Sequence, residues 1–138
     1  MKGTIRTIEH VGEWKIVARA DTRAELFSLV AGAIARAIGG ARGARTPWES
    51  VQVEARDVDG LLVDWANELI GRSEAAQRSY DAVRGVKLRK RPAGWIVQAS
   101  IRGADVPAWR SALKAATYHG ATVTRHGGRW RTELLFDV

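Results

Sequence analysis

A capped, amphipathic stretch at residues 21–40 sets the first limit on the fold. Thr22 followed by Glu25 has the spacing of a capping box, in which each side chain bonds the other residue's main-chain amide. Apolar residues then recur at helical spacing, and a glycine pair ends the pattern: Phe27, Val30, Ile34 and Ile38, then Gly39-Gly40. This predicts a helix with one face that must be buried.

A second helix is predicted from residue 57 onward, in DVDGLLVDWANELIGR. Asp57 or Asp59 is suited to cap its start, because an aspartate oxygen can accept from the free amides of the first turn. Its apolar stripe consists of Leu62, Trp65 and Leu69. The pattern leaves open whether this helix ends at Gly71 or continues towards Ala76.

The rest of the chain alternates between apolar and polar residues, as β-strands do. Strands are expected at 4–10, 14–20, 51–55, 80–90 and 94–103, with more around a tight turn at Gly127-Gly128. Two helices set among such strands indicate an α+β fold, with both helices packed on a mostly antiparallel β-sheet. The 138 residues suit a single compact domain over 1–138.

Composition narrows the classes of function. The chain has no cysteine, which excludes disulfides and thiolate chemistry. It has no apolar run of membrane-spanning length, and its start does not resemble a signal peptide, so we expect a cytoplasmic protein without a membrane partner. No nucleophile elbow, phosphate-binding loop or zinc-ligand spacing is present, and we do not expect an enzyme.

The net charge of +7 favours polyanionic partners such as RNA or an acidic protein surface. Two basic groups are expected to form one basic surface on the sheet: residues 84–91, and Arg125 with Arg129 and Arg131. Contact with RNA there would be sensitive to salt. No aromatic RNA-reading motif accompanies these residues, so protein docking is the preferred role for them.

Two segments resemble the archease family: GLLVDWANELI at 60–70 and LKAATYHGATV at 113–123. The pair Glu9-His10, the AELF at 24–27 and the final FDV also fall at the family's usual places, so the resemblance covers nearly the whole chain. It implies a small α+β protein without catalytic activity that activates an RtcB-type RNA ligase. Such a cofactor promotes guanylylation of the ligase's histidine and repeated turnover in tRNA splicing and RNA repair. The alternative is a stand-alone RNA-binding or chaperone-like modulator of tRNA modification.

The resemblance also implies a divalent metal site. The family's first metal-binding aspartate aligns with Glu13, and its C-terminal aspartate aligns with Asp137. The terminal carboxylate of Val138 is expected to add oxygen donors. Calcium is the expected ion, with magnesium or manganese as alternatives, because calcium better tolerates the longer arm of a glutamate. Lys15 stands where the family has glycine, and it would compete with the ion if its side chain lay towards Glu13.

Further residues match the family's second motif. Lys114 and His119 are expected to contact a phosphate or the ligase. His119 could instead bond only to the backbone, and His10 is expected to be structural. On the second helix, Asp64, Asn67 and Glu68 are expected to form a solvated face, with docking or buried hydrogen bonding as the alternative.

Overall fold

The computed structural model, which describes residues 2–138, has two helices between two antiparallel sheets. The helices are α1 (Arg23–Ile38) and α2 (Val58–Ala76). The strands are β1 (Thr4–His10), β2 (Glu13–Ala20), β3 (Glu49–Ala55), β4 (Arg78–Arg91), β5 (Gly94–Asp105), β6 (Ala115–His126) and β7 (Arg129–Asp137). The predicted α+β class is confirmed, and the structure adds that the strands form two sheets.

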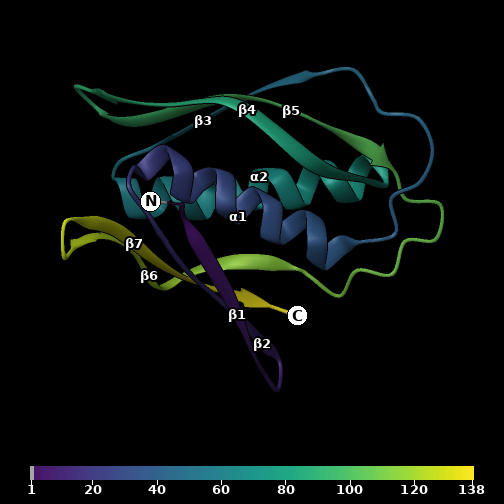
Figure 1. Cartoon of the computed structure of the whole chain (residues 1–138), viewed down its shortest axis with the longest axis horizontal. Coiled ribbons are helices and arrows are strands. Elements are labelled where there is room, and N and C mark those ends of the chain that lie inside the picture. The colour runs from purple at the N-terminus through teal and green to yellow at the C-terminus, as the bar shows by residue number, and fades with distance from the viewer. Residues whose placement is uncertain (1) are drawn as a thin grey trace.

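The sheets lie on opposite sides of the helices, giving a three-layered molecule (Figure 1). We call the four-stranded sheet, in the order β1-β2-β7-β6, sheet A, and the three-stranded sheet, in the order β3-β5-β4, sheet B. Both contribute to one apolar core around the helices, for example through Ile16 and Leu134 of sheet A and Val97 of sheet B. A helix covered on both sides needs a wide apolar surface.

The sequence of α2 meets this requirement directly, since the consecutive residues Leu61, Leu62 and Val63 are all fully buried. Trp65 joins the two helices, because its indole Nε1 donates a hydrogen bond to the main-chain oxygen of Phe27 at 3.0 Å. Asp57 is the cap, with its Oδ1 accepting from the Gly60 amide at 2.7 Å. The helix continues to Ala76, which settles the open question about its end.

At the start of α1, a cation–π contact joins the helix layer to each of the two sheets. The guanidinium of Arg23 lies 4.7 Å from the ring centre of Trp95 in β5 and 4.6 Å from that of Trp130 in β7. A guanidinium at these distances is attracted to the electron-rich ring faces. Of the helices within residues 2–138, none is long and apolar enough to cross a membrane.

Candidate metal centre

Glu13 and Asp137 lie directly opposite each other at the end of the β2–β7 pair. Opposed residues of an antiparallel pair project to the same side of the sheet, with β-carbons about 4.5–5.5 Å apart. The next opposed pair, Trp14 and Phe136, is buried in the core, so the two acids project to the outer face of sheet A. Glu13 and Asp137, far apart in sequence, are therefore brought together as the resemblance implied.

The strand ends that carry these acids are held from the core side. The rings of Trp14 and Phe136 have centroids 5.0 Å apart and are inclined at 51°, a favourable arrangement for an aromatic pair. The amide of Val138 donates to the main-chain oxygen of Gly12 at 3.4 Å, which brings the chain beyond β7 to the β1–β2 turn. Aromatic packing next to each acid limits the freedom of its backbone.

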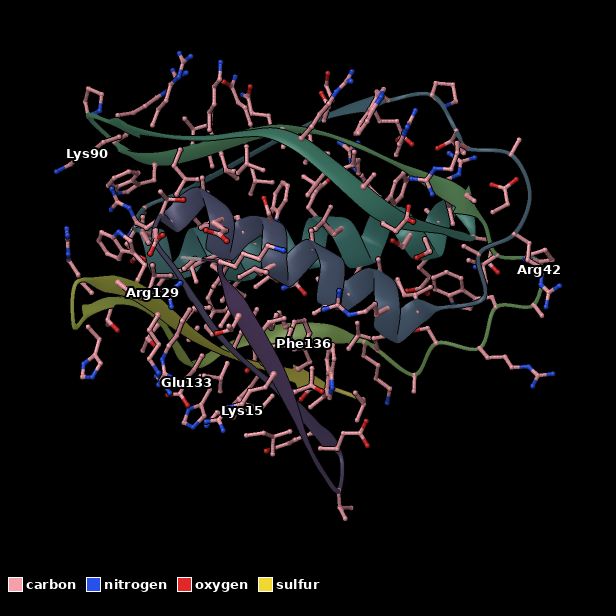
Figure 2. The ribbon with its side chains drawn as sticks, in the orientation of Figure 1. Lys15, Arg42, Lys90, Arg129, Glu133 and Phe136 are labelled. Carbon is pink, nitrogen blue, oxygen red and sulfur yellow. The ribbon has the colours of Figure 1, made fainter. Side chains whose placement is uncertain are left out.

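Lys15 does not lie towards Glu13. Its Nζ is 2.6 Å from Oε1 of Glu133 on β7, and Figure 2 shows the two side by side on the lower sheet. Glu133 also lies 3.3 Å from Arg131. Hydrogen bonds from Lys15 and then from Arg131 hold the pKa of Glu133 below its ordinary value. The cation that could compete with a metal is thus held further along the sheet.

Two residues are predicted to contact a phosphate or the ligase, and Lys114 is the one that lies beside the acid pair. Its amide donates to the main-chain oxygen of Asp137 at 3.0 Å, and the residue is exposed. His119 is exposed too, but it lies in a bulge between Thr117 and Thr122, further along β6. The strand position of His10 is opposite Glu13, and its side chain lies outside the described part of the structure.

An open pocket of about 480 Å³ adjoins Glu13. Glu13 and Val138 line it, together with the charged residues Glu9 and Arg36. Among the side chains that the structure describes, which do not include that of His10, no three or more of histidine, cysteine, aspartate or glutamate come together as a metal-binding group. A cation here would therefore be held by two side-chain carboxylates and main-chain oxygen, with water completing its shell.

The predicted solvated face of α2 is wrong for Asn67, which makes part-buried hydrogen bonds, whereas Asp64 is partly exposed and bonds the exposed Tyr118. The Asn67 amide donates to the main-chain oxygen of Ala116 at 3.0 Å, and its Oδ1 accepts from the Ala116 amide at 2.7 Å. The Tyr118 hydroxyl donates to the Asp64 carboxylate, and this bond is the main reason that the pKa of Tyr118 is raised. The two family-like segments therefore bind each other, which no periodicity within either segment could show.

The predicted single basic surface is also wrong, because its two halves lie on different sheets. Residues 84–91 belong to β4 of sheet B, whereas Arg125 is on β6 and both Arg129 and Arg131 are on β7 of sheet A. Arg129 and Arg131 are moreover ion-paired, with Asp21 and Glu133 respectively.

Comparison with known proteins identifies the family of this chain. The model of the Archease protein family (MTH1598/TM1083) matches residues 6–138. The chain belongs to the archease family. It is 33% identical over 137 residues to protein archease of Methanopyrus kandleri, covering 95% of this chain and 96% of that protein. Protein archease of Methanosarcina mazei is 23% identical over 136 residues, covering 95% of this chain and 93% of that one.

Solved structures of the family share the fold. The solution structure of Methanobacterium thermoautotrophicum protein 1598 superposes with a TM-score of 0.77 at 18% identity, covering 97% of this chain and 98% of that one. The crystal structure of a Thermotoga maritima archease, described as a possible chaperone, gives a TM-score of 0.65 at 15% identity, covering 96% of each chain. At 18% and 15% identity, the structural similarity supports the fold alone.

Proposed function

We propose that this family member is a protein cofactor of an RtcB-type RNA ligase and has no catalytic activity of its own. It would act in the cytoplasm, promoting guanylylation of the ligase and repeated turnover in tRNA splicing and RNA repair. Family membership supports the proposal, and the observation that carries it for this chain is the direct pairing of Glu13 with Asp137.

The proposal includes a divalent cation, with calcium foremost. Glu13, Asp137 and a main-chain oxygen of Val138 would hold it. Oxygen donors of this kind suit calcium, whose flexible shell accepts the longer glutamate arm, better than they suit magnesium. Within residues 2–138 neither carboxylate is ion-paired with a basic side chain, and opposed like charges favour a bound cation. The ion would supply positive charge between the two carboxylates.

Lys114 and His119 are the proposed contacts to a phosphate or to the ligase. Lys114 is the better placed, since its main chain is bonded to Asp137 and its side chain is exposed. His119, on the exposed bulge, would reach a partner that extends along β6.

Ligase turnover measured with and without this protein tests the proposal. We expect multiple turnover and faster guanylylation with wild type, and loss of both with Asp137→Asn or Glu13→Gln. Each variant removes one charge while keeping nearly the same side-chain volume. Glu74→Gln, at an exposed position near the end of α2, is the matched control and should retain full stimulation. Equal ligase rates with and without wild-type protein would refute the proposal.

Calorimetry with calcium separates the metal from the partner. Wild type should bind calcium, and Glu13→Gln should bind it more weakly. Glu133→Gln should also weaken binding, by about threefold to tenfold, because the freed Lys15 ammonium would approach Glu13. Adding Lys15→Met to that variant should restore the affinity. Wild type that fails to bind calcium, magnesium or manganese would remove the metal from the proposal.

The alternative role, a chaperone-like or RNA-binding modulator of tRNA modification, draws on the positive charge of the chain. It predicts that tRNA binding persists when Glu13 and Asp137 are neutralised and that ligase turnover is unaffected by wild type. The two assays therefore separate the two roles.

A further inference from the structure

Sheet B carries a row of basic residues on its outer face. Val97, Ala99 and Ile101 of β5 face the core, so the alternate residues Gln98 and Ser100 face outward. The register places Lys87 and Arg84 of β4 opposite these two. The row consists of Arg84, Lys87, Arg89 and Arg91 on β4, with Arg102 on β5. Figure 2 shows nitrogen-tipped side chains rising from this side of the molecule.

A bulge creates this row. Arg84 and Lys87 are three positions apart and would face opposite sides of a regular strand. Between them β4 has one more residue than β5, and Gly85 adopts the positive φ of 65° that such a bulge accommodates. The extra residue turns Lys87 to the outer face, and Val86 and Leu88 turn to the core.

These charges are not neutralised by the protein itself. No ion pair joins any of the five to an acid among residues 2–138. Elsewhere on or beside the same sheet, arginines are paired: Arg45 with Asp81, Arg72 with Glu68, and Arg78 with Glu49 and Asp105. Five basic residues without an acidic partner among residues 2–138 therefore lie together on this face.

The rest of the face is mostly polar, with the fully buried Ile96, which lies opposite both Arg89 and Glu54, as an apolar member. Gln98 donates from Nε2 to Oε1 of Gln52 at 2.8 Å across β5 and β3, and the opposed Ser50 and Ser100 lie beside this pair. Glu54 of β3 is the acid of this face within the described strands. Alternate residues on a strand lie about 7 Å apart, so Lys87, Arg89 and Arg91 present charges at a regular interval.

Trp48 holds two members of the row in place. The guanidinium of Arg84 lies 3.9 Å from its ring centre and that of Arg102 4.7 Å. The Nε of Arg102 is buried without a hydrogen-bond partner in the described structure. Stacking on one ring limits the freedom of both side chains, which lowers the entropy lost when an anion binds.

We infer that the outer face of sheet B binds the phosphate backbone of RNA without reading its bases. Rows of arginine and lysine favour phosphates, and sequence-specific binding of single strands would require aromatic rings free to stack on bases. Trp48 is occupied by its own arginines. The choice of RNA as the polyanion rests on the proposed function, whereas the phosphate-binding chemistry does not.

The position of this face distinguishes it from the metal centre. Glu13 and Asp137 lie on the outer face of sheet A, and the helix layer separates the two sheets (Figure 1). A partner bound at the acids would leave sheet B exposed. One molecule could thus contact the ligase with one face and hold an RNA strand on the other.

Anisotropy titration of a labelled oligouridylate over a series of salt concentrations tests this inference. Five phosphate contacts predict a slope of log K against log salt of about −3.5, or about a 100-fold loss of affinity between about 50 and about 200 mM. Lys87→Gln with Arg89→Gln should reduce the slope to about −2. The matched control is Arg6→Gln with Arg19→Gln, which removes the same charge from exposed positions of sheet A and should leave the slope unchanged.

The outcomes are decisive in each case. Equal effects of the two double variants would show general electrostatic attraction and overturn the inference, as would absence of binding by wild type at the lowest salt. If the sheet B variant impairs ligase stimulation and leaves RNA binding intact, the face is a protein-docking surface and the inference is wrong. Binding of RNA by a chain that does not stimulate the ligase would refute the proposed function alone.

Discussion

Replacing Asn67 with alanine should test how α2 is joined to sheet A. β6 is an edge strand of this sheet, so peptide groups on its free side have no neighbouring strand. The Asn67 side chain supplies both a donor and an acceptor to Ala116, as a further strand would. Asn67→Ala removes both partners and leaves a peptide group of a buried residue unpaired.

The expected cost follows from those two bonds. An unsatisfied buried polar group costs about 1–3 kcal/mol, and partial access of water at this half-buried site favours the lower half of that range. Two groups give about 2–4 kcal/mol of lost unfolding free energy. At an unfolding entropy of about 2.1 cal/mol/K per residue, a chain of 138 residues should melt about 7–14 °C lower.

Urea denaturation and thermal melting measure this loss directly. Glu68→Ala is the control, because it alters the next residue of the same helix and breaks only a partly exposed ion pair with Arg72. That change should cost less than about 1 kcal/mol. Asn67→Asp keeps the acceptor but loses the donor, and should be at least as unstable as Asn67→Ala. A loss for Asn67→Ala no larger than that of Glu68→Ala would refute the reasoning.

Four further substitutions have defined outcomes. The pKa of Glu133 is lower in the folded protein than its ordinary value of 4.5, so its ion pairs stabilise the fold at pH values above 4.5. Glu133→Gln should therefore lower stability to urea at neutral pH. The difference should disappear once the pH has fallen through the depressed pKa. Asp64→Asn should lower the raised pKa of Tyr118 towards its ordinary value, as followed by phenolate absorbance; an unchanged titration would contradict the hydrogen bond. Gly103→Ala should destabilise by about 3 kcal/mol or more, because its β-carbon would overlap the main-chain oxygen of the facing strand. Gly71→Ala, in open space on α2, should instead stabilise by up to about 1 kcal/mol in the same melts.

The helices and the α+β class could be predicted because their signals are local. The bond from the Glu25 amide to the Thr22 hydroxyl, at 3.1 Å, is one of the two that the capping box predicted. The Glu25 carboxylate accepts from the Gly3 amide at 2.8 Å in place of the second. The division into two sheets was missed, although Leu61, Leu62 and Val63 carried a signal for it. Three consecutive apolar residues exceed the stripe that one sheet can cover, and they indicate a helix buried on both sides.

The pairing of Glu13 with Asp137 followed from the family resemblance, since no local pattern relates residues at opposite ends of a chain. The orientation of Lys15 could not be predicted, because it depends on Glu133 of another strand. The bulges in β4 and β6 were hidden for a similar reason. An extra residue reverses the alternation that a strand pattern relies on, and only the partner strand shows that it is extra.

The order of strands in sheet A has a consequence for how the protein is made. β7, the last strand described, inserts between β2 near the start of the chain and β6. Until it emerges from the ribosome, the β1–β2 hairpin has no partner along one edge and Glu13 has no Asp137 opposite it. Contacts of such long sequence separation form late because closing the chain between them costs entropy. A chain in which β7 has not yet joined the sheet would therefore lack the acid pair.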